Sequence, residues 1–448
     1  MRPETIGEFA SYNGYKNLPS AVRESAKLAI LNFMAVTIGA NSYDQSKIII
    51  MACQGIQEGN FPIYGSSRTA GIIGSTWANS ALSHLLDFDD THLETIVHPS
   101  APVIPGAMNA GIQLKADGKD LIYSAAIGME IAIRLAMTIG LDERYSDWHN
   151  TSLFGTAAGA VAYSLMHKPV PEIVTDAFLQ GLTVATGFLS NRGTVTKSFQ
   201  VGRSAAEGVI SGIAAMNGVT VSKNIPNTFA LSLTGKSDLE KLTQNLGKEW
   251  EILRNFLKPY PCGVVLHPGI DAAIELRNKI KIQEVERIDV FVNPVVPVLT
   301  GIMEPKNGLE SKFSVPHAIA AALLFGPLYP EHFSDTLVKE AAVVSLRKRV
   351  HVYPKEDINR GQTRIEIILK DGRKEISEIN RGSVTPSKHL TLEEVKTKFY
   401  HLVIPVYGES SANDIWEYFV NIEQKHDLGE IIELFHTAEQ NIKIPETK

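Results

Sequence analysis

The sequence has few cysteines, no excess of positive charge and no long hydrophobic run. Its 448 residues include only Cys53 and Cys262, which cannot form a disulfide framework or a four-thiolate metal site. The formal net charge is −6 and no basic block occurs, so neither nucleic acid nor an anionic membrane is an expected partner. An anionic substrate would therefore need positive charge that is concentrated locally in the fold.

We also expect no segment of this sequence to target or anchor the chain. Residues Met1–Glu4 run into polar sequence without the apolar stretch of a signal peptide. The longest uncharged apolar stretches, such as Leu28–Ala40, are too short to span a bilayer. The glycines match no phosphate-binding loop, dinucleotide fingerprint or nucleophile elbow. We therefore expect a cytoplasmic protein outside these nucleotide-binding and serine-hydrolase classes.

The first half of the chain has the periodicity of successive helices. Apolar residues recur at helical spacing in Leu18–Ala40 and again in Gly118–Gly140. Many of these segments are rich in alanine and glycine, which lets helix axes approach closely. The pattern predicts a large, tightly packed helical domain. Its further helices are expected at Ser75–Leu86, Ala101–Leu114, Thr151–Met166, Pro171–Phe188 and Ser204–Val219.

The composition changes after about residue 255. Arg287–Leu299 is rich in Val, Ile and Phe, and Thr363–Ile379 alternates around Asp371-Gly372, a strong hairpin dipeptide. Helices are expected near Ser314–Phe325 and from Thr391, where Thr391 and Glu394 can form a capping box. A chain of this length should form two domains. We therefore predict a mainly α protein with an α+β second domain: an all-helical domain (1–255 and 400–448) and a smaller α/β lid domain (256–399).

The densest group of chemically active side chains lies between Asp87 and His98. Three aspartates and two histidines occur within these twelve residues. At the end of a helix, Asp87 and Thr91 would share a face at i, i+4 spacing. Helix capping with a solvated acidic turn explains the cluster about as well, because Asp and Thr favour caps. A metal site is the weaker alternative, since no clear ligand spacing is present.

Further candidates are spread along the chain. His149 precedes a helix rich in small residues, where the helix dipole lowers an imidazole pKa and backbone N–H groups can hold a carboxylate. Lys197 and Arg203 lie in what we interpret as a glycine-punctuated loop before a helix, and they could bind an anion. Ordinary capping and solvated surface lysines are the plainer interpretations of both segments.

Two later segments carry histidines next to prolines. Lys258-Pro259-Tyr260-Pro261-Cys262-Gly263, followed by His267-Pro268-Gly269, forms a turn stiffened by Pro and Gly. His317 stands in Lys312-Phe313-Ser314-Val315-Pro316-His317, at the entry to an alanine-rich helix. A buried, unreactive role is the usual one for a lone cysteine such as Cys262.

Taken in order, these segments resemble the MmgE/PrpD family, which includes 2-methylcitrate dehydratase, cis-aconitate decarboxylase and iminodisuccinate epimerase. The matches run from about residue 80 to 325. They comprise Leu86–Thr91 with His98-Pro99-Ser100, Gly128-Met129-Glu130 with Arg134, His149 with Gly155-Thr156, Thr196-Lys197 with Gly202-Arg203, Lys258–Cys262 with His267-Pro268, and Lys312–Pro316.

The resemblance implies a helical domain with an α/β lid, a homodimer, and an active site between the domains that needs no metal or organic cofactor. It places the family's active-site residues at Asp87, Thr91, His98, His149, Lys197 and His267. We expect Lys197, Arg203, Lys258 and His317 to bind the substrate. The sequence departs from the family pattern at four places, each of which bears on the substrate. The gap between Asp87 and His98 is one residue longer than in the cis-aconitate decarboxylases. Gln200 stands where decarboxylases and the epimerase have histidine, His317 replaces an aromatic residue, and the lysine segment lacks the dehydratases' tryptophan.

The family's reactions form or quench carbanion character next to a carboxylate. They need cations for the carboxylates together with an acid and a base of matched pKa. We expect Lys197 and Arg203 to anchor the substrate, and His98, His267 and His149 to transfer protons. A lyase (dehydratase or decarboxylase) acting on a small di- or tricarboxylic acid is the first prediction. An epimerase of an iminodisuccinate-like acid and an inactive carboxylic-acid-binding paralogue are the alternatives.

Overall fold

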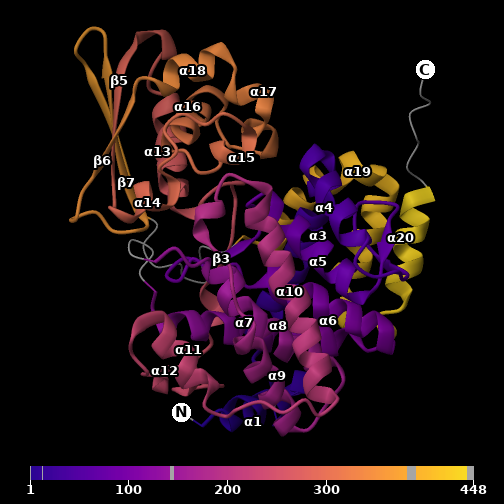
Figure 1. Cartoon of the computed structure of the whole chain (residues 1–448). Helices are drawn as coiled ribbons and strands as arrows, with labels where there is room; N and C mark the ends of the chain where they lie inside the picture. The colour runs from indigo at the N-terminus through magenta and orange to yellow at the C-terminus, as the bar shows by residue number, and fades with distance from the viewer. Residues whose placement is uncertain (1, 13, 142–145, 381–389, 441–448) are drawn as a thin grey trace.

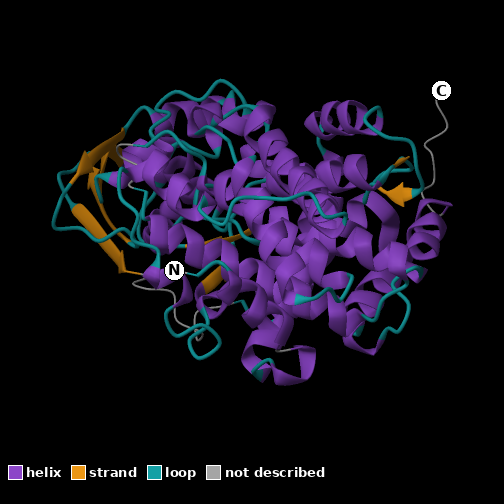
Figure 2. Ribbon diagram, turned by 60° about the horizontal axis from the view of Figure 1, so that its bottom comes forward, coloured by secondary structure: helices purple, strands orange, loops and turns teal. Residues whose placement is uncertain are grey.

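The computed structural model describes residues 2–12, 14–141, 146–380 and 390–440 of a predominantly helical protein (Figure 1). A smaller part of the chain, with a four-stranded sheet, lies at one end of the helical body (Figure 2). This is the predicted fold class. The helices of the larger part are α1 (Glu4–Tyr12), α2 (Gly14–Asn17), α3 (Ser20–Gly39), α4 (Asp44–Gln54), α5 (Ile72–Leu85), α6 (Ser100–Leu114), α7 (Gly118–Ile139), α8 (Asn150–Met166), α9 (Pro171–Thr183), α10 (Val195–Met216), α11 (Ile225–Thr234) and α12 (Glu240–Thr243).

Helix α10 begins at Val195, nine residues before Ser204, where we predicted its start. We expected a loop from Thr194 to Arg203, but α10 already starts at Val195. Gly202 lies inside the helix because α10 crosses α5 at very short range. A Cβ atom at this position would lie 2.4 Å from the carbonyl oxygen of Trp77. The glycine therefore permits close helix packing and does not mark a loop.

Helix α7 is long and apolar enough to cross a membrane by length and composition alone, the one such helix among the described residues. In the fold, 89% of its most apolar window is buried inside the protein. It packs against α8 and α6 in the helical body. Its apolar composition is therefore that of a core helix, for which burial by neighbouring helices is sufficient reason.

The smaller part is built on a mixed sheet with the order β6-β5-β7-β8. β5 (Val285–Val292) pairs in parallel with β6 (Val350–Pro354) and antiparallel with β7 (Gln362–Leu369), which forms the predicted hairpin with β8 (Lys374–Asn380). Gly372, at φ 87°, makes the hairpin turn. Alternate residues of β7 are buried, as a strand with one covered face requires. The helices of this part are α13 (His267–Arg277), α14 (Val295–Thr300), α15 (Gly308–Ser311), α16 (Val315–Phe325), α17 (Asp335–Val338) and α18 (Ala341–Arg347).

The chain returns to the helical body after the sheet. Thr391 and Glu394 form the predicted capping box at the start of α19 (Leu392–Val420), which packs on α3. Gly408, at φ 78°, kinks α19, and α20 (Glu430–Gln440) follows. Two large hydrophobic clusters result, one spanning the helical body with α19 and α20, the other formed mainly by residues 256–369. The domain limits at 255/256 and 399/400 remain our proposal for dividing these two parts.

Candidate functional site

The centre of the site is a turn between α5 and a three-residue strand. Helix α5 ends at Leu85, and Asp87 takes the left-handed conformation at φ 52°, which Asp tolerates better than most residues. The chain then continues as β3 (Asp90–His92), which pairs antiparallel with β4 (Asn255–Leu257). Lys258 directly follows β4 and is therefore carried to Asp87, 171 residues away in the sequence.

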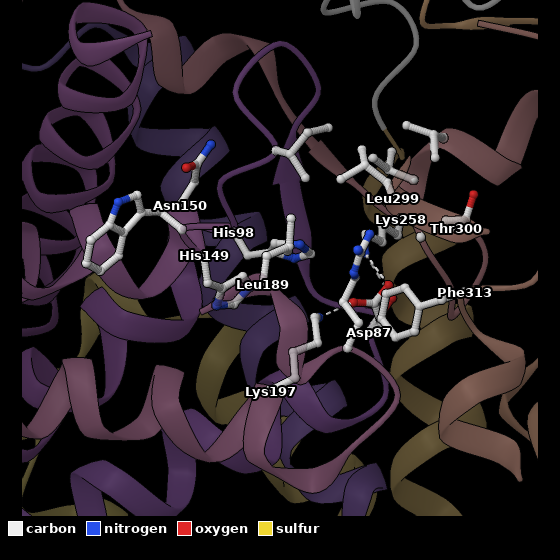
Figure 3. Close-up of a pocket in the computed structure, with 16 residues that line it drawn as sticks. Asp87, His98, His149, Asn150, Leu189, Lys197, Lys258, Leu299, Thr300 and Phe313 are labelled. Carbon is white, nitrogen blue, oxygen red and sulfur yellow. Dashed lines mark hydrogen bonds and ion pairs between the residues drawn. The ribbon is translucent and has the colours of Figure 1, made fainter. Parts of the chain in front are cut away.

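Asp87 is a buried carboxylate held between two lysines. Its Oδ1 atom accepts a hydrogen bond from Lys197 Nζ at 2.6 Å, and its Oδ2 atom accepts one from Lys258 Nζ at 3.0 Å (Figure 3). Lys197 reaches it from the first turn of α10. Burial raises the pKa of Asp87, but the two ammonium groups outweigh it and hold the pKa well below its usual range. The group is therefore an ionised carboxylate near neutral pH.

Two more buried lysines fix the backbone of the same turn. Lys312 Nζ donates to the carbonyl oxygen of Leu86 at 2.9 Å, and Lys398 Nζ donates to that of Phe88 at 2.7 Å. Burial lowers the pKa of Lys312 to about 8 and that of Lys398 well below its usual value. Neither lysine lines the pocket that Asp87 faces. They hold the turn from outside the pocket, so that Asp87 keeps its strained conformation.

A hydrogen-bonded row of polar side chains lies beside the turn. The buried Asp89 accepts from two histidines, with 2.6 Å from Oδ2 to His84 Nδ1 and 3.0 Å from Oδ1 to His98 Nδ1. Thr91 Oγ1 lies 3.1 Å from the same nitrogen of His98. The Nε2 atom of His84 is 2.7 Å from Lys197 Nζ. The row thus links Lys197, through His84 and Asp89, to His98.

His149 is the N-cap residue of α8, and its Nδ1 atom lies 2.9 Å from Ser152 Oγ. Its ring centroid is 5.6 Å from that of His84, which in turn is 4.6 Å from that of His98. Burial lowers the pKa of His98 to about 3 and lowers the pKa values of His84 and His149 as well. These imidazoles are therefore neutral near pH 7 and can act as proton acceptors.

Asp87, His98, His149, Lys197 and Lys258 line one pocket of about 540 Å³, part of which is open to solvent. In Figure 3, His98 and His149 lie on one side of it, and Leu299, Thr300 and Phe313 of the smaller part lie on the other. Polar groups thus converge in a largely apolar wall, as in small-molecule sites. The lining residues are Asp87, Ile96, His98, Trp148, His149, Asn150, Leu189, Arg192, Lys197, Lys258, Gly263, Val264, Val265, Leu299, Thr300 and Phe313.

Arg192 is a lining residue that the sequence did not reveal. It lies just after a short 3-10 turn (Leu189–Asn191), in a segment without helical or strand periodicity. Its Nη1 atom donates to the carbonyl oxygen of Val298 in α14, so it bridges the two parts of the protein. Gln200, the departure from the family pattern, holds this segment. Its side chain accepts from the backbone N–H of Phe188 at 3.1 Å and donates to the Phe188 carbonyl oxygen at 3.0 Å.

Four of the expected site residues do not line this pocket. Thr91 lies behind His98, which it contacts at 3.1 Å. Arg203 is 55% exposed in its side chain and lies 3.6 Å from Glu207. Lys197 and Arg203 are six residues apart on one helix, which turns their side chains about 120° away from each other. His317 is buried in the smaller part and its Nε2 atom lies 2.9 Å from the carbonyl oxygen of His332. His267 starts α13 and packs edge-on against Tyr260, with 5.3 Å between ring centroids.

Among the described residues, one group has a spacing that could suit a metal ion: His84, Asp89 and His98. One possible ligand atom of each lies within 4.8 Å of those of the other two. The surrounding charges fit a hydrogen-bonded network better. Lys197 Nζ, itself paired with Asp87, lies 2.7 Å from His84 Nε2 and would repel a cation. Both oxygens of Asp89 already accept from the imidazoles.

The matches to known proteins cover nearly the whole chain. The sequence model of the MmgE/PrpD N-terminal domain matches residues 4–230, and that of the MmgE/PrpD C-terminal domain matches residues 260–424. A cis-aconitate decarboxylase of Aspergillus terreus is 24% identical over 468 residues, covering 96% of this chain and 95% of the relative. The cis-aconitate decarboxylase-like protein oryM of Aspergillus oryzae is 22% identical over 454 residues, covering 93% and 94%.

Proposed function

Because the chain belongs to the MmgE/PrpD family, we propose that it is a lyase acting on a small di- or tricarboxylic acid. The observation that carries the proposal is the convergence of Asp87, His98, His149, Lys197 and Lys258 on one pocket. These residues come from four separate segments of the sequence, since only Asp87 and His98 belong to the same one. A capping or solvation role for each alone would not require them to meet.

The charge of the pocket supports an anionic substrate. Lys197 and Lys258 share the single carboxylate of Asp87, and Arg192 adds a third cation to the lining. Positive charge therefore remains in excess in a place where burial strengthens its interaction with carboxylates. The planar guanidinium of Arg192 suits a carboxylate in particular, because it can donate two parallel hydrogen bonds.

The neutral histidines supply the proton transfers that a lyase needs. In a dehydration, a base such as His98 or His149 removes the proton next to a carboxylate, and the electron pair forms the double bond as hydroxide leaves with a proton. In a decarboxylation, the C–C bond breaks, CO₂ leaves, and the electron pair remains next to another carboxylate until a proton is added there. Lys197 would stabilise the developing charge in both cases.

We rank decarboxylation of an unsaturated tricarboxylic acid such as cis-aconitate first, because the curated relatives carry that name. Dehydration of an acid such as 2-methylcitrate is the second form of the lyase. We further propose that the chain's own side chains provide the acid and base without an added cofactor, and that the protein is a cytoplasmic homodimer. Activity after exhaustive treatment with a chelator tests whether a metal is needed, and light scattering of the purified protein tests the dimer.

An epimerase is the alternative from another reaction class. A two-base epimerase removes a proton from one side of a carbon and returns one from the other side. Two neutral imidazoles, His98 and His149, line the pocket and could take these two roles. The substrate would then be an iminodisuccinate-like dicarboxylic acid.

The test is proton NMR in D₂O of the chelator-treated protein with 2-methylcitrate, citrate, cis-aconitate and iminodisuccinate. New vinyl signals indicate dehydration, and loss of a carboxyl group with uptake of deuterium indicates decarboxylation. Exchange of an α proton with a change of diastereomer indicates epimerisation. Lys197→Met should abolish the observed reaction, whereas Lys223→Met, at a lysine with 49% side-chain exposure paired with Asp176, should not. If every acid stays unchanged, the lyase and epimerase proposals fail, and an inactive acid-binding paralogue explains the site better.

A further inference from the structure

Asp89 does not line the pocket, yet it contacts His98, which does, and His84, which lies behind Lys197. Both of its oxygens are buried, and each accepts a hydrogen bond from the Nδ1 atom of a different imidazole, at 2.6 Å from His84 and 3.0 Å from His98. Despite the burial that raises it, the pKa of Asp89 is held well below its usual range by the two histidines. An ionised carboxylate can only accept hydrogen bonds. Each Nδ1 atom facing it must therefore carry a proton.

This constraint fixes the tautomers of both neutral rings. A neutral imidazole has one N–H, so a proton on Nδ1 leaves a lone pair on Nε2. On His84 that lone pair lies 2.7 Å from Lys197 Nζ and accepts a hydrogen bond from the ammonium group. On His98, which lines the pocket, Nε2 becomes the basic nitrogen.

We propose that Asp89 is a positioning residue that keeps His84 and His98 protonated on Nδ1, so that His98 Nε2 is the base of the pocket and His84 Nε2 orients Lys197. The consequence for turnover rests on the proposed function, whereas the tautomers do not. Asp89 acts through the histidines and touches no reacting atom.

Replacing Asp89 with asparagine makes the proposal testable, because the amide is nearly the same shape but has one acceptor and one donor side. The carbonyl oxygen can accept from only one imidazole, and the NH₂ group must face an unprotonated Nδ1 of the other. If His84 changed its tautomer, its Nε2–H would face the ammonium group of Lys197, two donors 2.7 Å apart in the parent structure. His98 is therefore the ring we expect to switch, and its Nε2 atom would no longer be a base.

The first measurement is nitrogen NMR of the protein labelled with ¹⁵N-histidine, with the two signals assigned from His84→Gln and His98→Gln variants. Protonated and unprotonated ring nitrogens have well-separated shifts. In the unaltered protein near pH 7, we expect both rings to be neutral with the proton on Nδ1. A proton on Nε2 of His98 would overturn the proposal, whether or not Asp89→Asn folds and whatever reaction the protein performs.

The second measurement compares Asp89→Asn with Asp90→Asn on the substrate found by the NMR panel. Asp90 is the neighbouring buried carboxylate, but its partners are Ser100 and Asn255 (2.5 Å from Asn255 Nδ2). In Asp89→Asn we expect the His98 proton to move to Nε2, kcat to fall roughly 10²–10⁴-fold, and KM to change much less. Asp90→Asn should keep the parent tautomers and a kcat within a few-fold of the parent. A purely structural Asp89 would instead leave kcat and the His98 tautomer unchanged in folded protein, and that result would refute the proposal.

Discussion

Asp87 Oδ1 lies 2.6 Å from the Nζ atom of Lys197, and this ion pair joins the turn after α5 to the first turn of α10. Both groups are buried, and the carboxylate also pairs with Lys258 at 3.0 Å. A buried charge is tolerated only when it is paired and hydrogen-bonded. The pair therefore serves two purposes: it stabilises the meeting of distant segments, and it keeps the ammonium groups oriented at the pocket.

Asp87→Asn should weaken both stability and turnover, because it leaves two buried ammonium groups without their carboxylate. We expect the free energy of unfolding to fall by about 3–5 kcal/mol. We expect kcat/KM to fall by roughly 10²-fold or more, since displaced cations misplace the substrate. Urea unfolding and steady-state kinetics measure the two effects. Asp44→Asn is the control, because Asp44 pairs with Lys47 while its side chain is 89% exposed. Equal effects of the two substitutions would contradict the assigned role of Asp87.

Arg192 and Arg203 offer a direct test of which arginine binds the substrate. Arg192 lines the pocket, whereas Arg203 lies on another face of α10 beside Glu207. We expect Arg192→Gln to raise KM by one to two orders of magnitude, roughly the 1.5–3 kcal/mol of a hydrogen bond to a charged group. Arg192→Lys should recover part of this loss, since it restores the charge but not the planar fork. Kinetics of Arg203→Gln complete the test. A large KM effect there, with none at Arg192, would restore the assignment made from sequence.

The sequence predicted the long elements better than the site they assemble. Periodic apolar residues located α3 and α7 within two residues of their ends, and Asp371-Gly372 located the hairpin. The approach of Lys258 to Asp87, in contrast, depends on pairing between two strands of three residues each. Strands this short show no measurable alternation, so only the family resemblance brought the two residues together.

Local structure that the sequence did not indicate explains where the predicted site and the pocket lining differ. Reading the segment before Ser204 as a loop allowed Lys197 and Arg203 to face the same ligand, but a helix turns them apart. His84 was missed because one histidine in an apolar helix usually signals nothing. Its value comes from Asp89, five residues later beyond a left-handed turn, which no helical or strand period relates to it.

The Glu130–Arg134 motif is expected to act on stability and not on catalysis. Arg134 Nε lies 2.5 Å from Glu130 Oε1, and the guanidinium also donates to the carbonyl oxygens of Gln244 and Glu249 at 2.7 and 2.6 Å. Neither residue lines the pocket. Arg134→Ala leaves Glu130 buried without its partner and should lower the free energy of unfolding by about 3–5 kcal/mol. The kcat of the folded variant should stay within a few-fold of the parent. A loss of kcat without a loss of stability would place this pair in the catalytic machinery instead.

His317 and Asp90 are buried groups with shifted pKa values, and each should make the free energy of unfolding depend on pH. Single variants can separate their two contributions. Burial lowers the pKa of His317 to about 4, whereas an unfolded histidine titrates near about 6.5. Between these values the unfolded chain binds a proton that the folded chain excludes, so stability falls as the pH decreases from about 6.5 to about 4. Asp90 acts in the opposite direction. Burial raises its pKa to about 6, so the folded carboxyl group binds a proton that the unfolded one does not bind until about pH 4.

We therefore expect His317→Gln to reduce the slope of unfolding free energy against pH near pH 5 by about 1.4 kcal/mol per pH unit. Asp90→Asn should steepen the slope by a similar amount, because it removes the contribution of opposite sign. The asparagine can be accommodated if the amide of Asn255 turns, since its Oδ1 atom has no hydrogen-bond partner among the described residues. Chemical denaturation between pH 4.5 and 7.5 measures all three slopes. Shifts of the same sign in the two variants would show that at least one of these groups does not titrate as its surroundings require.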